Sequence, residues 1–244
     1  TIVDGERITA DRTGNQIYEL YARDNGAGDN FGYSVAISAN YAIVGAPLSN
    51  QSPGTDSGSA YIFDIRTGNE IYELTGNDLQ GGAQFGWSVA IDNKHAAVGA
   101  RKMNASVSYV GRIYVFELKT GNQILNTLMP PNERQWGDEL GYSVAISGNY
   151  AAAGVVYDDE NGSNSGTVYV FDIHSGLLVY KLQPNVPEAG AYFGNSVSMS
   201  GNYIIVGANG TDSGGFTDSG SAYIFDLRSG LQVKKITASD AAKS

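Results

Sequence analysis

Short apolar runs that alternate with polar residues recur along the whole chain. Four of these runs begin at Phe31, Phe85, Leu140 and Phe193, and their first residues are separated by 54, 55 and 53 positions. Alternation with period two is typical of half-buried β-strands. Self-similarity at such a spacing is typical of repeat architectures. The sequence is therefore best interpreted as four copies of one structural unit.

Each copy contains four such runs. In the first copy they cover residues 31–37, 41–46, 60–64 and 70–74, and the other copies repeat them in phase. Val, Ile, Tyr and Phe dominate the runs, as in packed strands, and Gly in the turns permits positive φ. The pattern predicts an all-β protein whose four-stranded antiparallel units are the blades of a β-propeller. A β-solenoid is the less favoured alternative, because solenoid turns usually repeat in about 20 to 30 residues.

The repeats divide one predicted domain, residues 1–244, into blades at about 31–84, 85–139, 140–192 and 193–244. Residues 1–30 predict a partial further blade, because 12–20 nearly match 66–74. Two interpretations stay open: the chain ends complete a five-bladed ring, or the chain is a piece of a larger propeller. We favour the closed five-bladed ring, since exposed sheet edges invite aggregation.

Two short motifs carry a family resemblance. The Phe-Gly pairs at 31–32, 85–86 and 193–194, together with Gly45-Ala46-Pro47, resemble FG-GAP repeats, which occur in integrin α-subunit propellers and many bacterial surface proteins. Leu140 and 154–155 depart from the pattern. The resemblance implies a propeller used mainly for extracellular binding and adhesion. The Asp-x-Asp-x-Asp-Gly loop of calcium-binding integrin-type blades is missing from the first hairpins, so those calcium sites do not carry over.

The charge and the cysteine content of the chain exclude some classes of partner and of chemistry. The net charge is −10 at pH 7, the sequence pI is about 4.5, and no basic stripe is present. Nucleic-acid binding and direct membrane insertion are therefore not expected. The chain has no cysteine, which excludes disulfides and thiol catalysis. At 244 residues it is long enough to bury a sizeable core without them.

The long, variable connections point to a binding face. In an up-and-down blade, the loops between second and third strands share one face of the disc with the connections between blades. Variable loops on a rigid scaffold usually carry binding. The predicted ligand-binding residues on this long-loop face are Trp136, Arg134, Asp138, Arg101, Tyr109, Tyr157, Tyr192 and Phe216. A Trp beside an Arg and carboxylates suits a sugar or protein contact; the alternative is that Trp136 packs beneath its own loop.

Two acidic loops are candidate calcium sites, because Ca²⁺ takes six to eight oxygen ligands. Their residues are Asp158, Asp159, Glu160 and Asn161 in one loop, and Asp24 and Asp29 in the other. The alternative is a pair of solvated acidic turns, and no cofactor is expected to be required. Four Asn-x-Ser/Thr sequences predict glycan acceptors in a secreted protein, or arise by chance: Asn50, Asn104, Asn161 and Asn209.

Catalysis is not predicted. His95 and His174 fall in the second-strand start and a short turn, where the other copies carry unrelated residues. The favoured function is a non-catalytic extracellular or cell-surface module that recognises a protein or a carbohydrate. The first alternative is a structural subunit of a homo- or hetero-assembly. A propeller-based lyase or hydrolase is the least favoured, although two loops could still bring a carboxylate pair together.

Overall fold

The computed structural model describes most of the chain. The described residues are 2–3, 6–7, 16–24, 26–50, 54–104, 109–124, 128–130, 137–212 and 216–238. Their regular elements are strands, as predicted, and within these ranges no helix has the length and apolarity to cross a membrane.

Four antiparallel sheets follow one another along the chain, each with its strands in sequence order. The first blade contains β3 (Ser34–Ser38), β4 (Tyr41–Ala46), β5 (Ser59–Asp64) and β6 (Glu70–Leu74). The second contains β7 (Phe85–Ile91), β8 (His95–Ala100) and β9 (Arg112–Glu117). The third contains β10 (Val144–Ser147), β11 (Tyr150–Val155), β12 (Thr167–Asp172) and β13 (Leu178–Leu182). The fourth contains β14 (Ser196–Ser200), β15 (Tyr203–Ala208), β16 (Ser221–Asp226) and β17 (Leu231–Ile236).

The predicted fourth strand of the second blade appears, among its described residues, as two isolated bridges. Gln123 pairs with Phe116 and Leu128 with Ile113, both antiparallel. They occupy the place that β6, β13 and β17 take in the other blades. The four-blade architecture is thus confirmed.

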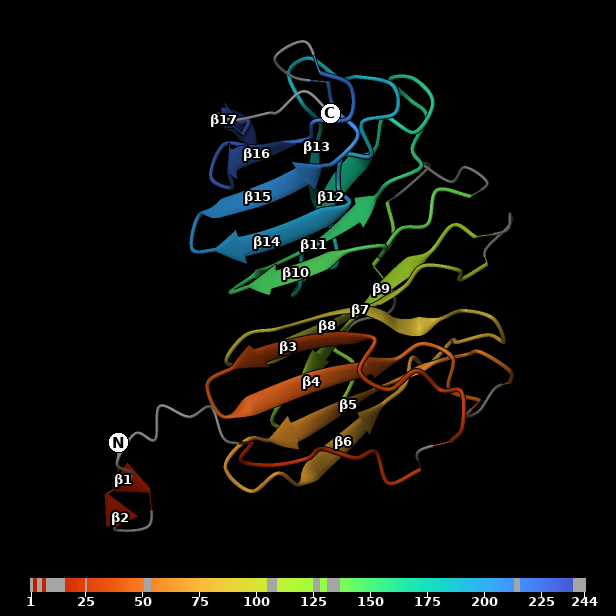
Figure 1. Cartoon of the computed structure of the whole chain (residues 1–244), viewed down its shortest axis with the longest axis vertical. Helices are drawn as coiled ribbons and strands as arrows, with labels where there is room; N and C mark the ends of the chain where they lie inside the picture. Colours follow the sequence, from red (N-terminus) through yellow and green to blue (C-terminus); the bar gives the residue numbers. More distant parts are fainter. Residues whose placement is uncertain are drawn as a thin grey trace.

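The blades are stacked side by side in an open arc (Figure 1). Strand β7 packs against the first blade, β10 against the second, and β14 against the third. In Figure 1 the tight turns, such as that between β14 and β15, lie on the left, and the long loops lie on the right. The predicted separation of a short-turn face and a long-loop face is therefore visible in the fold.

The core lies in the seams between blades. Phe85 is fully buried and meets Tyr114 and Phe116 of its own blade edge-on, at ring distances of 5.2 and 5.9 Å. The same cluster includes Ile43 and Ile62 from the facing side of the first blade. Two further clusters fill the next two seams in the same way. Each blade thus depends on its neighbour for burial of one sheet face.

A close backbone contact explains why the motif contains its glycines. A Cβ added to Gly45 would stand 2.1 Å from the carbonyl oxygen of Gly86 in the next blade. The Ser34 hydroxyl donates to that same oxygen at 2.8 Å. The equivalent bonds join Ser88 to the Gly141 carbonyl and Ser143 to the Gly194 carbonyl, both at 2.7 Å. The Phe-Gly pair and the first Gly of the Gly-Ala-Pro triplet are therefore two halves of one seam.

The predicted partial blade at the start of the chain is not established. Strands β1 (Ile2–Val3) and β2 (Glu6–Arg7) pair with each other and not with a blade, and residues 16–22 form no strand. Tyr18 nevertheless behaves as a fourth-strand residue. Its hydroxyl donates to the Arg66 carbonyl at 2.6 Å, as the Tyr72 hydroxyl donates to the Lys119 carbonyl at 2.9 Å.

Candidate functional site

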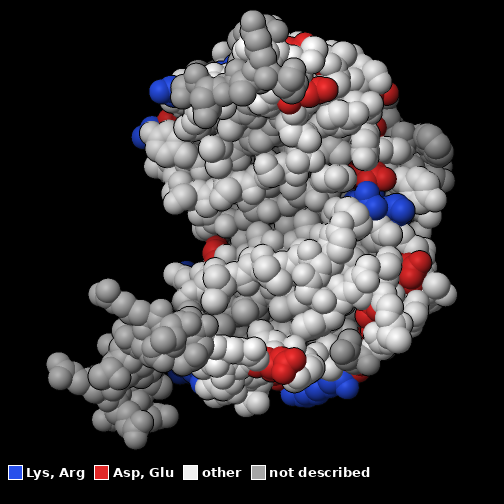
Figure 2. Space-filling view, viewed as in Figure 1, with Lys and Arg blue, Asp and Glu red and all other residues white. Residues whose placement is uncertain are grey.

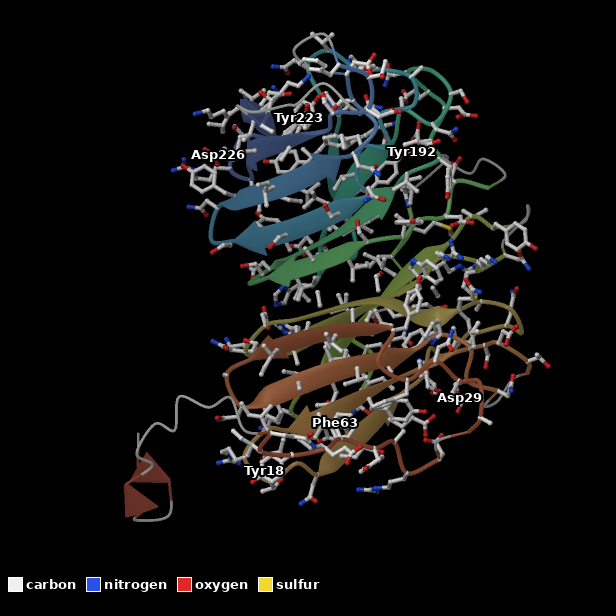
Figure 3. All side chains as sticks on the ribbon, viewed as in Figure 1. Tyr18, Asp29, Phe63, Tyr192, Tyr223 and Asp226 are labelled. Carbon is white, nitrogen blue, oxygen red and sulfur yellow. The ribbon has the colours of Figure 1, made fainter. Side chains whose placement is uncertain are left out.

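Five aromatic side chains form a continuous row on the long-loop face. Consecutive ring centroids are 4.4, 6.0, 6.1 and 6.2 Å apart. We call this row the aromatic belt, and its members are Tyr33, Trp87, Tyr142, Tyr157 and Tyr192. Tyr33 is 47% exposed and the other four are half-buried. In Figure 3 Tyr192 lies among the long loops, on the opposite side of the molecule from Asp226.

The repeat itself positions most of the belt. Tyr33, Trp87 and Tyr142 are each the residue after a Phe-Gly or Leu-Gly pair, at or just before the first strand of a blade. The amide of each closes a tight turn, as Trp87 N does on the Gln84 carbonyl at 3.1 Å. The turn holds these three rings at equivalent places in successive blades.

The residue before each Phe-Gly or Leu-Gly pair has a left-handed backbone. Gln84, Glu139 and Tyr192 have φ of 58°, 56° and 52°, which is uncommon for residues other than glycine. Asn30 shares this conformation in the first blade, so the strain belongs to the architecture. In the later blades this position supplies side chains to the site, because Gln84 and Glu139 both contact Arg101.

Arg101 ties two blades together beneath the belt. Its guanidinium carbon lies 3.3 Å from the Trp87 ring centroid, a close cation–π stack. Its Nη1 donates to Glu139 Oε2 at 2.8 Å and its Nε donates to Gln84 Oε1 at 3.0 Å. The Arg101 and Glu139 side chains are only 14% and 13% exposed. A planar guanidinium held by two side chains supports the orientation of the Trp87 ring.

The site carries little net charge. Burial raises the pKa of the Glu139 carboxyl, and this outweighs the opposite effect of the Arg101 guanidinium. Burial also raises the pKa values of the Tyr33 and Tyr157 phenols, so both stay neutral at physiological pH. The belt is thus a row of neutral rings beside a mutually neutralised ion pair. Such a surface can stack against apolar faces while the hydroxyls exchange hydrogen bonds.

The structure brings together three of the eight residues predicted to bind a ligand. Arg101, Tyr157 and Tyr192 lie in or against the belt. Tyr109 lies outside it, 42% exposed, with the Lys102 ammonium 5.8 Å from its ring centroid. Phe216 and Asp138 are half-buried in their own loops, and Trp136 and Arg134 lie outside the described residues.

Sequence reasoning missed Tyr33, Trp87 and Tyr142. The signal was present, because three of the four copies carry an aromatic residue after the Phe-Gly or Leu-Gly pair, while the fourth carries Asn195. Arg101 was a second signal, since it stands where Pro47 completes the Gly-Ala-Pro triplet of the first copy. Residues that directly follow the motif's glycines therefore mark the site better than loop length does.

The carboxylates of the first acidic loop are engaged by nearby backbone amides or by a lysine of β13. Asp158 is buried and accepts the Glu160 amide at 2.8 Å, Asp159 accepts the Asn164 amide at 2.6 Å, and Glu160 pairs with Lys181. Across the described ranges no group of three or more His, Cys, Asp or Glu residues could hold a metal ion.

The second acidic loop follows the same pattern. Asp29 is buried and accepts the Gly26 amide at 2.7 Å, while one carboxylate oxygen of Asp24 is buried without a hydrogen-bond partner. Exposed Asn161 completes the predicted ligand set of the first loop. Calcium binding stays a prediction in both places.

The predicted glycan acceptors differ in accessibility. Asn50, Asn161 and Asn209 are exposed, and Asn104 is half-buried. The side-chain oxygens of Asn50 and Asn104 already accept the amides of Asp56 and Tyr109, each at 3.0 Å. Use of these sites likewise stays a prediction.

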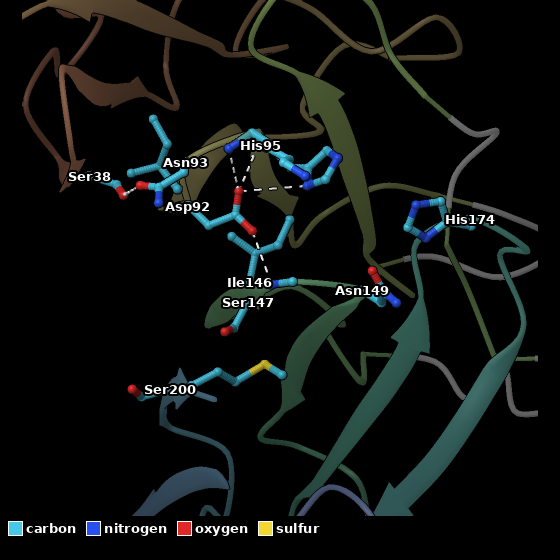
Figure 4. A pocket seen from close by; sticks show the side chains of 13 residues that line it. Ser38, Asp92, Asn93, His95, Ile146, Ser147, Asn149, His174 and Ser200 are labelled. Carbon is cyan, nitrogen blue, oxygen red and sulfur yellow. Dashed lines mark hydrogen bonds and ion pairs between the residues drawn. The ribbon is translucent and has the colours of Figure 1, made fainter. Parts of the chain in front are cut away.

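Apart from the belt, a hollow of about 650 Å³ opens on the short-turn face (Figure 4). It gathers His95 and His174, whose rings meet edge-on at 6.4 Å, a proximity that their sequence positions did not predict. Asp92 Oδ1 accepts the backbone amides of Lys94 and His95, and its Oδ2 accepts that of Gly148. Because this carboxylate is engaged by the turns, the hollow is a weaker candidate than the belt.

Comparison with known proteins supports the architecture. No curated protein sequence matches the chain. Among solved structures, Kuenenia stuttgartiensis hydrazine synthase is similar, with a TM-score of 0.56 and 13% sequence identity over 89% of this chain and 53% of that one. The chain thus spans about half the length of that protein's chain, and the likeness at this identity shows the fold alone. The FG-GAP repeat family model matches residues 15–63, 69–116, 129–171 and 178–225, well over half of the sequence. The chain belongs to the FG-GAP repeat family.

Proposed function

We propose that this protein is a non-catalytic binding module that recognises a neutral carbohydrate through the aromatic belt. The observation that carries the proposal is the unbroken row of five rings from Tyr33 to Tyr192, with no centroid separation above 6.2 Å. One face of a pyranose ring presents C–H groups that pack well on aromatic rings. Successive rings of the belt are inclined to one another by 42°, 55°, 89° and 88°, so the row offers faces and edges in turn to successive sugar units. The FG-GAP propeller fold is consistent with a binding or structural module.

The electrostatics favour a neutral sugar over a charged one. Among the described residues, Arg101 is the cation that lies against the belt, and it is engaged by Glu139 and Gln84. An anionic sugar would need a donor that is free to turn toward it, and Arg101 would have to leave a buried partner to provide one. A protein ligand is the alternative outcome of the test below. The extracellular or cell-surface location stays a prediction from the family resemblance.

A screen against immobilised neutral and acidic oligosaccharides, with matrix proteins on the same surface, tests the proposal. Tyr33→Ala and Tyr157→Ala each remove one ring of the belt from an exposed or half-buried position. Tyr109→Ala is the matched control, because Tyr109 is a similarly exposed tyrosine on the long-loop face outside the belt. The expected result is selective binding to a neutral sugar class, lost in the two belt variants and retained in the control.

Two results would overturn the proposal. Sugar binding that persists in both belt variants would move the ligand elsewhere on the protein. Binding to a matrix protein alone, or to nothing on the surface, would remove carbohydrate as the ligand. Each belt variant is checked by thermal melting, so that loss of fold is not mistaken for loss of binding.

A further inference from the structure

The outer face of the fourth blade exposes apolar residues that the other blades bury. Ile205 is 41% exposed, whereas its counterparts Ile43, Ala97 and Ala152 are fully buried against a following blade. Val233 on the same face is 58% exposed. These residues help to line an apolar groove of about 410 Å³ over β14, β15, β16 and β17. Figure 2 shows few charged side chains over the middle of this side of the molecule.

The backbone of this face has the same glycines that contact the following blade in the three formed seams. A Cβ added to Gly99 would stand 2.2 Å from the carbonyl of Gly141 in the next blade, but one added to Gly207 would meet only Ser196 of its own blade. Gly58 is bridged in parallel to Phe85 of the following blade. Its counterpart Gly220 has only Asn209 and Ala208 of its own blade nearby. The outer face of the fourth blade therefore has an open surface equivalent to the one on which a Phe-Gly or Leu-Gly pair packs in each of the other three seams.

The first blade has the complementary surface, which in the other blades packs against the preceding blade. Val35 and Ile37 are each 69% exposed, whereas their counterparts Val144 and Ile146 in the third blade are 7% and 6% exposed. Gly32 has φ of 90°, against 87°, 89° and 91° for Gly86, Gly141 and Gly194 in the three formed seams. The pair at 31–32 is thus already in the conformation that docks.

We propose that this protein associates head to tail with a second copy of itself, the fourth blade of one copy packing on the first blade of the next. Val35 and Ile37 of the incoming copy fill the groove beside Ile205, and Ser196 donates to the Gly32 carbonyl as its counterparts do. The three seams within the chain provide the template for this interface. The contact is heterologous, since two different surfaces meet, and its geometry sets whether copies close into a ring or continue as a filament. The inference is independent of the proposed carbohydrate site.

Residues 16–24 have to move away from the first blade before a second copy can dock there. Residues 16–24 lie on the first blade where the outer strand of a preceding blade would lie, because Tyr18 contacts the 66–68 turn as Tyr72 contacts the turn at Gly121. An incoming β17 would compete for this place. The segment is also held by Arg23, whose backbone amide and guanidinium both donate to Glu70, and by Ala22, which is buried in a cluster with Val44 and Tyr61. Tyr18→Ala is therefore expected to strengthen association.

Sedimentation velocity over a concentration series tests the proposal. Ile205→Lys blocks the fourth-blade surface and Val35→Lys blocks the first-blade surface, and both positions are exposed enough to leave the monomer folded. Leu177→Lys is the control, because Leu177 is 68% exposed at the turn that precedes β13, outside both surfaces. The wild type and the control are expected to form concentration-dependent oligomers. Each blocked variant alone is expected to associate at least about tenfold more weakly.

Mixing the two blocked variants provides the sharpest result. The Ile205→Lys chain keeps its first-blade surface and the Val35→Lys chain keeps its fourth-blade surface, so an equimolar mixture should form a dimer and nothing larger. A wild type that stays monomeric at every concentration would overturn the proposal. So would blocked variants that associate like the wild type, or a mixture that contains only monomers.

Discussion

Gly99 and Gly141 meet backbone to backbone across the seam between the second and third blades. A Cβ on Gly99 would stand 2.2 Å from the Gly141 carbonyl oxygen, which also accepts the Ser88 hydroxyl at 2.7 Å. Gly99→Ala is therefore expected to destabilise the protein by about 1–3 kcal/mol, the usual cost of forcing extra volume into a packed interior. Urea denaturation measures the loss.

Gly207→Ala is the internal control for that substitution. Its new methyl group would meet only the Ser196 hydroxyl, a side-chain atom that can rotate away. At concentrations where the protein is monomeric, the free energy of unfolding should therefore fall less than in Gly99→Ala. If both variants lost the same free energy of unfolding, the close contact in the seam would not explain why each copy has a glycine at this position.

Phe85 is the central side chain of the first seam. It is fully buried between Tyr114 and Phe116 of its own blade and the apolar face of the first blade. Phe85→Ala should reduce the free energy of unfolding by about 3–5 kcal/mol, the typical cost of truncating a buried aromatic residue. Ile17→Ala, at a largely exposed position, should change it little. A loss below about 1 kcal/mol for Phe85→Ala would show that the core is placed wrongly.

Arg101 and Glu139 form a nearly buried pair, so removal of one partner strands the other. Arg101→Ala is expected to cost about 3 kcal/mol of stability at neutral pH. The pKa of Glu139 is already raised by burial, and it should rise further without the guanidinium. A carboxyl with a raised folded pKa costs stability above that pKa, and the cost disappears as the pH falls toward its ordinary 4.5.

Denaturation at two pH values checks this sign. The penalty of Arg101→Ala should be smaller near pH 5 than near pH 8, to an extent of about one kcal/mol or more. The double variant Arg101→Ala with Glu139→Gln should recover part of the loss, because it leaves no buried charge. Simple additivity of the two substitutions would rule out coupling between the side chains.

Asp226 is the last residue of β16, and its side chain closes the short turn that follows. Side-chain and backbone hydrogen bonds from Arg228 lower the pKa of Asp226 to about 2, from an ordinary 3.8. NMR titration should therefore find its midpoint near 2, and Arg228→Ala should move it back toward the ordinary value. A lowered folded pKa contributes stability that is present above about pH 3.8 and is lost as the pH falls through about 2.

The same turn in the first blade provides a repeat of the measurement. Arg66 donates to Asp64 and lowers the pKa of that carboxyl. Arg66→Ala should raise the Asp64 midpoint and leave that of Asp226 unchanged. A midpoint of Asp226 that does not respond to Arg228→Ala would mean that this turn is not closed by the arginine in solution.

Most of the fold could be predicted because the repeat supplies its own comparison. Runs such as 41–46 recur in every copy, so strand positions and the antiparallel order follow from one pattern. The start of the chain could not be predicted in this way. Residues 16–20 match the fourth strand 70–74 in sequence, yet a strand needs a neighbour to pair with, and Glu6–Arg7, in the predicted third strand of that blade, pair with Ile2–Val3 instead.

The candidate site was only partly predictable, for a different physical reason. Tyr157 and Tyr192 were chosen because they lie in variable loops, but Trp87 was passed over because it lies inside the repeated motif. Contact among these rings depends on how sharply one blade is rotated against the next, and one sequence does not state that angle. Arg101 illustrates the same limit, since its partners Gln84 and Glu139 come from two different inter-blade connections.

The glycine and serine seam also bears on how such a protein can change over evolutionary time. The backbone contact at its centre is made from a serine hydroxyl, a glycine carbonyl and a glycine without a side chain, so this contact is the same in each seam, while the apolar side chains around it differ. A duplicated or deleted repeat therefore keeps the backbone contact without a substitution in its neighbours, and only the surrounding apolar side chains have to match. The residue after each Phe-Gly or Leu-Gly pair lies outside this contact. Ligand preference can consequently drift one blade at a time while the assembly of the blades stays intact.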